Sequence, residues 1–400
     1  MVRGGAYRRK PTHDVCALGV CPWADYAGRQ YGSSLFGQCF LFSGERTGTP
    51  VRRSDNWDSL AHDPNGGFGQ RPTMARSERG IPWIGPSDGT SMKVLLTGAS
   101  SFTGYWFAKT LHSKGHEVVA PLRAPKDSYT GLRGERVRDL EQRGVTLLGG
   151  IPFGSPSFLT LVGKGADALC HHAAFVENYK SLDFDLMMAL ESNTCQVKAI
   201  FQKASESGIK TVIHTGSVFE QGEGCGETPL RAFSPYGLSK GLTHQILQYW
   251  ADSFEVPLVK FVIPNPFGPY EEPRFCDYLL KCWYKGETAI VKTPAYVRDN
   301  IHVSLLALVY ADFIERKTKD SNLKKLGPSG YIETQGAFAL RFASEIGKRL
   351  NIPTPVRLLP QTEFLEPRIR INTHIPDIQS LGWEEEKAWD DLGIYYQENR

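Results

Sequence analysis

Tyr236 and Lys240 are the residues whose types and spacing point most directly to chemistry. They stand four positions apart in the run Ser234-Pro235-Tyr236-Gly237-Leu238-Ser239-Lys240, at the expected start of a helix. Side chains at positions i and i+4 of a helix face the same way. A cation beside a phenol lowers the pKa of the phenol, which can then exchange a proton with a substrate hydroxyl. Tyr236 is therefore the candidate acid/base, with Lys240 as its partner.

A hydroxyl group is expected close to this pair. About twenty residues before Tyr236, a short apolar run at 212–214 ends in Thr215-Gly216-Ser217. Such a run is typical of a buried strand, and a hydroxyl at its end could hydrogen-bond the substrate oxygen that Tyr236 serves.

A glycine-containing turn, Thr97 to Gly104, follows the first apolar run and opens a helical pattern. Gly98 permits a tight turn, and Gly104 lets the helix pack closely on the strand. The amides of the loop and the helix N-terminus can then hold a pyrophosphate, which makes the whole loop a candidate cofactor site: Gly98, Ser100, Ser101, Phe102, Thr103 and Gly104. Its middle position, where the backbone usually comes nearest the phosphates, is Ser101 instead of glycine. The alternative is an ordinary turn between strand and helix.

The end of the second expected strand bears on the kind of dinucleotide. Sites for NAD usually carry Asp or Glu there, to accept the ribose hydroxyls. This chain has Leu122 followed by Arg123, which favours the 2′-phosphate of NADP. Arg123 as a solvated loop residue is the alternative, so the expected cofactor is NAD or NADP.

The elements that must position these residues alternate between strand and helix. Short apolar runs lie at 93–96, 118–122, 145–148, 168–170, 212–214 and 259–263, and helical patterns at 104–113, about 184–207 and 237–254. This rhythm predicts an α/β fold, a Rossmann-type doubly wound parallel sheet covered on both faces. Residues 92–264 are expected to form the nucleotide-binding domain, and 265–400 mainly a smaller substrate-binding lobe. Asn265 follows the last of these strands at its carboxyl end, where ligands of open sheets bind.

Residues 1–91 differ in composition from the rest of the chain. They hold 14 Gly, 7 Pro and a net charge of +3, whereas 92–400 is neutral. Turn-forming residues interrupt them every few positions, so we expect a disordered N-terminal extension. Met92 opens directly onto a strand, which favours a native start at or near that residue.

Several classes of function are disfavoured. No apolar stretch reaches the roughly 18 residues of a membrane-spanning helix. With 46 basic against 43 acidic residues, neither nucleic acid nor a membrane is an expected partner. Eight cysteines are too few for a disulfide scaffold, which predicts reduced thiols and a cytoplasmic location. His171 and His172 are adjacent on a strand and should face opposite ways, so no metal site is expected.

Beyond these separate signals, the chain from Met92 onward resembles the extended short-chain dehydrogenase/reductases, the NAD-dependent epimerase/dehydratase family that acts on nucleotide sugars. The resemblance is carried, in this order, by 97–104, His171-His172-Ala173-Ala174, Asn193, 214–219, Tyr236 with Lys240, 265–269 and 298–303. Departures are Ser101, Gly150 in place of a frequent Asp, and Ser304-Leu305 in place of frequent acidic residues.

The resemblance implies roles for individual residues. Tyr236 would be the acid/base, and Lys240 would lower its pKa and bind the nicotinamide ribose. Counting back from Val218-Phe219 gives Thr215 as the residue that orients the substrate hydroxyl, with Ser217 as runner-up. Further cofactor contacts are expected from Ala173 and Pro264. The expected substrate-binding residues are Ser217, Asn265, Arg298 and one or both of Arg368 and Arg370, which precede Leu381-Gly382-Trp383.

Three reactions remain open within this family. Dehydratases carry an Asp-Glu pair after the active-site Thr, whereas Gly216-Ser217 follow Thr215 here, so dehydration is disfavoured. Epimerisation of a nucleotide sugar through a keto intermediate is placed slightly ahead of NADPH-dependent reduction. A non-catalytic NAD(P)-binding sensor is the alternative from another class. A homodimer is the candidate assembly.

Overall fold

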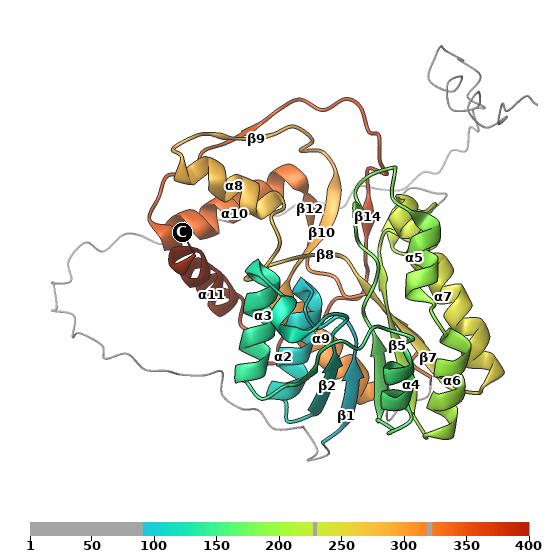
Figure 1. The fold of residues 1–400 in the computed structure, drawn as a ribbon. Coiled ribbons are helices and arrows are strands. Elements are labelled where there is room, and N and C mark those ends of the chain that lie inside the picture. Colours follow the sequence, from blue (N-terminus) through green and yellow to red (C-terminus); the bar gives the residue numbers. More distant parts are fainter. Residues whose placement is uncertain (1–90, 227–229, 318–321, 400) are drawn as a thin grey trace, which may run out of the picture. The chain divides into compact units, whose positions relative to one another are not determined.

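A computed structural model describes residues 91–226, 230–317 and 322–399 (Figure 1). The expected N-terminal extension lies outside the described residues, apart from Ser91. Among the described ranges, no helix has the length and apolar character needed to cross a membrane.

A seven-stranded sheet forms the centre of the fold, in the order β11-β7-β5-β4-β1-β2-β3. All of its neighbouring strands pair in parallel. Six of the strands contain or closely match the expected apolar runs, and β11 was not foreseen. The seven are β1 (Lys93–Leu96), β2 (Glu117–Pro121), β3 (Thr146–Leu148), β4 (Ala168–His171), β5 (Thr211–Ser217), β7 (Leu258–Ile263) and β11 (Lys325–Leu326).

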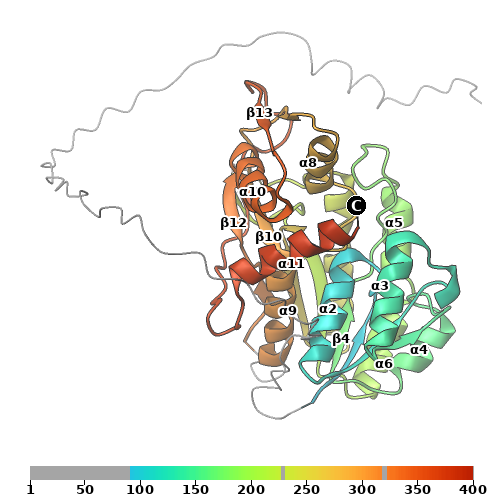
Figure 2. The same cartoon turned by 90° about the vertical axis from the view of Figure 1, so that its left-hand side faces the viewer.

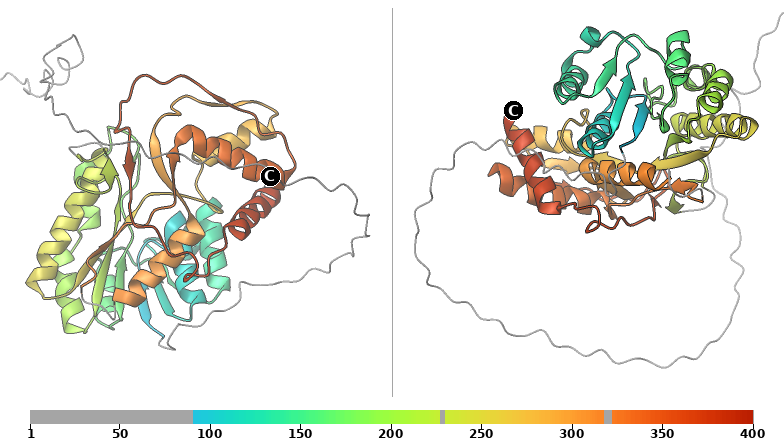
Figure 3. Two further views of the ribbon diagram at one scale, coloured as in Figure 1. Left: turned by 180° about the vertical axis from the view of Figure 1, so that it is seen from behind. Right: turned by 90° about the horizontal axis from the view of Figure 1, so that it is seen from below.

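Helices cover both faces of this sheet, which confirms the doubly wound α/β fold. One face packs on α2 (Phe102–Ser113), α3 (Gly131–Gln142) and α9 (Val303–Lys317), and Figure 3 shows α9 running along the sheet from behind. The other face packs on α4 (Pro156–Val162), α6 (Val197–Glu206) and α7 (Pro235–Ser253). Alternate strand residues serve the two faces, so Val94 and Leu96 point to one core and Leu95 to the other.

The helix expected over about 184–207 is two helices, which corrects that prediction. α5 (Leu186–Asn193) ends at the cap residue Thr194, and α6 begins after Gln196. Gln196 has a left-handed backbone with φ of 52°, which no residue of a right-handed helix can have. The apolar pattern continues across this break, so periodicity alone did not reveal it.

A smaller unit follows the large sheet in the chain and lies above it in Figure 1. Its three-stranded sheet, in the order β12-β10-β8, joins β12 (Tyr331–Thr334), β10 (Val297–His302) and β8 (Asn265–Phe267). α8 (Phe275–Tyr284), α10 (Gln335–Leu350) and α11 (Glu385–Glu398) share a third core with it, and Figure 2 shows α11 passing below α10. The remaining elements are η1 (Lys126–Ser128), β6 (Cys225–Gly226) with β14 (Arg370–Ile371), and β9 (Ala289–Val291) with β13 (Val356–Leu358). Two elements within 265–400, α9 and β11, belong to the large sheet and its cover.

Candidate active site

The loop from Thr97 to Gly104 joins the end of β1 to α2 at the carboxyl edge of the large sheet. Thr97 Oγ1 accepts hydrogen bonds from the backbone N–H groups of His172 and Ala173, both at 3.0 Å, and so ties β1 to the end of β4. Gly98 has φ of +80°, and a β-carbon on it would lie 2.9 Å from Ala173 N. A β-carbon on Gly104 would overlap the carbonyl oxygen of Gly98. Both glycines are therefore required by close backbone contact.

Ser101, the departure in the middle of the loop, caps α2. Its Oγ accepts from Gly104 N at 3.2 Å and donates to Gly98 O at 2.8 Å. The hydroxyl is thus held against the loop's own backbone. Gly104 N is taken by this cap, whereas the amides of Phe102 and Thr103, which open α2, remain available to an anion. This arrangement fits the pyrophosphate of a dinucleotide.

Arg136, on α3, supports the same loop by donating to its backbone. The sequence did not predict this role. The Arg136 guanidinium, fully buried, donates to the carbonyl oxygens of Ser100 at 3.1 Å and Tyr270 at 3.2 Å. It also pairs with Glu272 at 2.7 Å. Arg136 therefore connects the loop to the chain segment that follows β8. No local pattern marks an arginine of a polar helix for such a role.

The residues expected to choose between the two nicotinamide cofactors lie just beyond β2. Leu122 is buried, whereas Arg123 is exposed. Arg123 is therefore placed at the surface, where it can reach a charged group on a ligand. Its reading of a 2′-phosphate stays a prediction.

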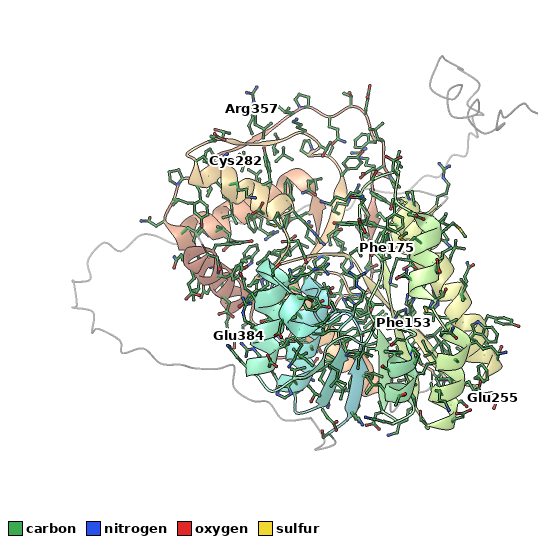
Figure 4. All side chains as sticks on the ribbon, viewed as in Figure 1. Phe153, Phe175, Glu255, Cys282, Arg357 and Glu384 are labelled. Atoms are coloured by element: carbon green, nitrogen blue, oxygen red, sulfur yellow. The ribbon has the colours of Figure 1, made fainter. Side chains whose placement is uncertain are left out.

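His171 and His172 face opposite ways, as expected for neighbours on a strand. His171 stacks on Phe153, which Figure 4 labels, at 4.0 Å between ring centroids. Its Nε2 lies 3.0 Å from the carbonyl oxygen of Asn193, whose side chain also accepts from the N–H of Phe175 at 2.8 Å. His172 contacts the glycine loop instead. Within the described ranges no group of three or more potential metal ligands converges.

Tyr236 stands in the first turn of α7, which Ser234 caps by accepting from Gly237 N at 3.2 Å. The phenol ring packs edge-on against Tyr179 and Phe184, with centroids 5.5 and 5.9 Å away. Burial raises the pKa of Tyr236, and the charge of Glu220 raises that pKa further, while Arg274 opposes them. The phenol is thus protonated at neutral pH, so it can donate a proton but must lose its own before it can accept one. This direction is opposite to the lowering of the pKa that the neighbouring Lys240 was expected to cause.

Lys240 is buried one helical turn further along, and its Nζ lies 3.4 Å from Nε2 of His214 on β5. Burial lowers the pKa of Lys240 to about 8, Glu220 raises it and Lys260 lowers it. The pKa of His214 lies well below its usual value, again because of burial, so its imidazole is neutral and accepts a hydrogen bond from the Lys240 ammonium. Sequence reasoning did not find His214 as the partner of Lys240.

A buried ion cluster lies beneath these residues. Lys260 Nζ is 2.5 Å from Glu220 Oε2 and 2.8 Å from Glu223 Oε1. Glu220 Oε1 also accepts from the backbone N–H of Ser217 at 2.6 Å, which fixes the end of β5. Sequence reasoning missed this cluster, although Lys260 interrupts an otherwise apolar strand and could have signalled it.

The structure places the two candidate hydroxyls differently. Thr215 is buried and follows Ile213 on the face of β5 that α9 covers, beside Tyr310. It is therefore not brought together with His214 and Lys240, which face α7. Ser217 stands at the strand end, where its Oγ accepts from Phe219 N at 3.2 Å. The orienting role expected of Thr215 or Ser217 stays a prediction.

The expected substrate residues gather in the smaller unit. Asn265 is partly buried and opens β8, directly after Pro264, which is buried. Arg298 donates to Pro367 O at 3.0 Å, pairs with Glu366 at 3.1 Å and lies over the ring of Tyr296.

The two neighbouring arginines 368 and 370 differ in their surroundings. Arg370 is buried, and its guanidinium donates to the carbonyl oxygens of Val218, Glu220 and Arg231. It thus holds the segment after β5. Arg368 is exposed and lies over the ring of Phe364 at 5.2 Å.

Similar structures share this fold. A UDP-N-acetylglucosamine 4-epimerase from Methanobrevibacter ruminantium M1, in complex with UDP-N-acetylmuramic acid, is 15% identical with a TM-score of 0.60, covering 78% of this chain and 99% of that one. A UDP-glucuronic acid 4-epimerase from Bacillus cereus, with UDP-glucuronic acid and NAD, is 16% identical with a TM-score of 0.60 and coverages of 77% and 100%. A dTDP-glucose 4,6-dehydratase from Streptomyces venezuelae, with NAD bound, is 18% identical with a TM-score of 0.59 and coverages of 77% and 98%. At these identities the likeness concerns the fold.

Sequence comparison gives the family. An uncharacterized UDP-glucose epimerase, YtcB of Bacillus subtilis strain 168, is 24% identical over 196 residues, which are 47% of this chain. The match spans 61% of the length of that relative. The sequence model of the NAD dependent epimerase/dehydratase family matches residues 94–322, more than half of the chain. The chain therefore belongs to the NAD dependent epimerase/dehydratase family.

Proposed function

We propose that this protein is a nicotinamide-dependent epimerase of a nucleotide sugar, with Tyr236 as its acid/base. The observation that carries the proposal is the position of Tyr236 and Lys240. Both stand in the first turns of α7, after β5, while the glycine loop follows β1 in the same parallel sheet. A proton carrier and a phosphate-binding loop thus share the carboxyl edge of one sheet, where ligands of such folds bind.

The residues that would hold the cofactor are those of the loop 98–104, together with Ala173, Pro264, Tyr236 and Lys240. The buried ammonium of Lys240 would bind the nicotinamide ribose. When bound, the nicotinamide accepts a hydride from the sugar carbon and returns it. NAD bound to solved relatives and the name of the family support a nicotinamide cofactor.

The positive charges of Lys240 and of a bound nicotinamide ring would favour the phenolate of Tyr236, which would then take the proton of the sugar hydroxyl as that carbon is oxidised and give it back on reduction. The burial of its phenol, between Tyr179 and Phe184, excludes water from this exchange. The hydroxyl of Ser217, the runner-up that stands at the end of β5, would orient the same oxygen. If the transient keto sugar rotates in the site before it is reduced, the hydride returns to its opposite face and the product is the epimer.

The substrate class is a UDP-sugar or a related nucleotide sugar, because the solved relatives are complexes with UDP-sugars. Arg368 is the better placed of the two neighbouring arginines for a diphosphate, since it is exposed while Arg370 is occupied by backbone carbonyls. Asn265 and Ser217 complete the proposed contacts with the sugar nucleotide. The guanidinium of Arg298, expected to bind substrate, is buried and donates to Pro367 O and Arg368 O, so its proposed role is to hold the segment that carries Arg368.

NADPH-dependent reduction of a carbonyl is the second candidate. The observation that favours it is Arg123, exposed just beyond β2, where it can reach a 2′-phosphate.

A non-catalytic sensor would not require a buried phenol one helical turn from a lysine. Dehydration lacks the acidic pair after Thr215.

Assembly and location are part of the proposal. α5 and α7 carry exposed apolar side chains, including Met187, Met188 and Tyr249, and this face would pair two copies of the chain. The described cysteines, Cys170, Cys195, Cys225, Cys276 and Cys282, are all free thiols, which suits a cytoplasmic location.

The nucleotide that copurifies with the protein tests the choice of reaction. The purified full-length chain is denatured and the released nucleotide is identified by chromatography. Retained NAD supports an epimerase, which recycles its cofactor. A protein that releases none and then binds NADPH in preference to NADH supports the reductase.

A further inference from the structure

We propose that His172 is a positioning residue for the phosphate loop: its Nε2–H group holds the Ser101 hydroxyl against Gly98 and the first turn of α2. The inference rests on the proposed function, in which this loop holds the pyrophosphate of a nicotinamide cofactor. His172 follows β4, and Ser101 caps the helix after β1, so the two residues meet only in the folded chain.

The hydrogen bonds of Ser101 Oγ determine which group donates. The oxygen lies 2.8 Å from Gly98 O, 3.2 Å from Gly104 N and 3.1 Å from His172 Nε2. A hydroxyl has one proton and two acceptor sites. Its proton goes to Gly98 O, because a carbonyl oxygen can only accept. The contact with His172 therefore has the imidazole as donor, with the proton on Nε2.

The surroundings of His172 agree with this protonation state. Burial lowers its pKa to about 3, so the ring is neutral and carries one proton. Nδ1 is buried and has no hydrogen-bond partner among the described residues. Thr103 Oγ1 lies 3.1 Å from Nε2 and accepts from the same N–H group. The hydroxyl proton of Thr103 is then left to donate elsewhere.

Packing fixes the imidazole in place. A β-carbon on Gly98 would meet His172 Cδ2 at 3.2 Å, and one on Gly104 would meet it at 2.9 Å. The ring lies edge-on to Phe107, 5.1 Å between centroids, and the backbone N–H of His172 donates to Thr97. The imidazole thus occupies the space beside both outer glycines where a β-carbon would lie, and it hydrogen-bonds to the middle position of the loop.

The contact with His172 restricts the Ser101 side chain to one rotamer. A glycine here has no side chain that could come between the backbone amides and a phosphate. A serine has three rotamers. His172 favours the rotamer in which all hydrogen-bonding capacity of Oγ is used within the protein. Apart from Gly104 N, which donates to this hydroxyl, the loop can then offer its amides as a glycine loop does.

A double-mutant cycle on cofactor affinity tests the proposal. The dissociation constants of NAD and NADPH are measured by calorimetry for the full-length wild type, His172→Leu, Ser101→Gly and the double variant. His172→Leu should weaken binding of the preferred cofactor by about fivefold, the effect of losing one ordering hydrogen bond. Added to Ser101→Gly, the same change should alter affinity by less than about twofold, because the Ser101 hydroxyl is no longer there to be held. His172→Gln, whose amide can donate from a similar position, should recover most of the loss.

Controls keep the outcomes distinct. His112→Leu, at the far end of α2, should leave affinity unchanged. His172→Met, which has no donor but a flexible chain of similar length, replaces the leucine variant if that variant does not fold. Unchanged affinity in the donor-free variant, or an equal loss with serine and with glycine at 101, overturns the inference while cofactor binding stands. A wild-type protein that binds neither nucleotide overturns the proposed function, and the inference with it.

Discussion

At the scale of single residues, Lys240 shows what the site demands of the fold. Its ammonium lies in the core, 3.4 Å from a neutral imidazole, and its pKa falls from 10.5 to about 8. The unfolded chain therefore binds more protons than the native one between these pH values. Stability consequently rises with pH in that window and carries the full penalty of the buried charge below it.

Replacing this cation should stabilise the fold while removing activity. We expect Lys240→Met to raise the free energy of unfolding at pH 7 by up to about 3 kcal/mol, because a shift of one pKa unit corresponds to about 1.4 kcal/mol. The gain should shrink as the pH approaches 10, where native Lys240 is neutral. Urea unfolding at pH 7 and pH 10 measures both effects. Lys285→Met removes an exposed lysine and is the control. A Lys240→Met variant that is less stable than wild type at pH 7 would show that the buried charge of Lys240 does not destabilise the fold.

Arg123 carries the choice between the two cofactors. Arg123→Ala should weaken binding of NADPH more than that of NADH, by roughly 1–3 kcal/mol if the guanidinium hydrogen-bonds the 2′-phosphate. Fluorescence titration of both nucleotides measures the difference. Arg357→Ala, exposed in the smaller unit and labelled in Figure 4, is the matched control. An equal effect on both nucleotides shows that Arg123 does not read the phosphate.

The sequence was most informative where the relevant residues are close in the chain. Tyr236 and Lys240 share one helix, and Gly98 and Gly104 share one loop, so spacing alone could suggest their roles. His214, Glu220 and Lys260 meet Lys240 only through the packing of α7 on β5 and β7. No spacing rule links residues on different strands, so the partners of Lys240 could be found only in the structure.

At the scale of elements, continuous apolar runs predicted six parallel strands. A strand that is covered by helices on both faces buries every side chain, so successive residues are all apolar. The break between α5 and α6 escaped the same reasoning. It depends on one left-handed residue, Gln196, whose type carries no clear signal. β11 was not predicted because a strand of two residues is too short to show an apolar pattern.

The close approach of α2 to β1 is the element contact on which the phosphate loop depends. Gly104→Ala would place a methyl group onto the carbonyl oxygen of Gly98, so the loop must shift. We expect cofactor affinity to fall by more than about tenfold, because the amides of the first turn lose their alignment. Calorimetry with the preferred nucleotide measures the loss. Gly163→Ala, whose added β-carbon meets only ordinary contacts at 3.5 Å or more, should bind normally. Unchanged affinity in Gly104→Ala would refute the role of the loop.

At the scale of the whole molecule, the chain passes more than once between the large sheet and the smaller unit. α9 and β11 return to the sheet after β8 and β10. Arg298 on β10 holds the segment at Pro367, and Arg370 on β14 holds the segment after β5. A single boundary at 264/265 would not describe these returns. The return of the chain to the large sheet depends on strand pairing and packing between residues far apart in the sequence. Composition and periodicity do not reveal such contacts.

The exposed face of α5 and α7 predicts the assembly. Met187 and Tyr249 are 71% and 65% exposed, which is costly for large apolar groups unless another surface covers them. Met187→Lys with Tyr249→Lys should convert a dimer into a monomer in analytical ultracentrifugation. Leu340→Lys, on the exposed side of α10, should not. A wild type that sediments as a monomer at micromolar concentration would refute the dimer.

The most direct test of the central claim is turnover of UDP-sugars by wild type and Tyr236→Phe. Each protein is incubated with a trace of NAD and, in turn, UDP-glucose, UDP-N-acetylglucosamine and UDP-glucuronic acid, and the products are separated by chromatography. Wild type should convert one of them to its epimer without net consumption of NAD. Tyr236→Phe should bind NAD normally and turn over about 10²–10⁴-fold more slowly, because the transferable proton is gone. Near wild-type turnover in Tyr236→Phe, or product formed only with stoichiometric use of NADPH, would contradict the claim.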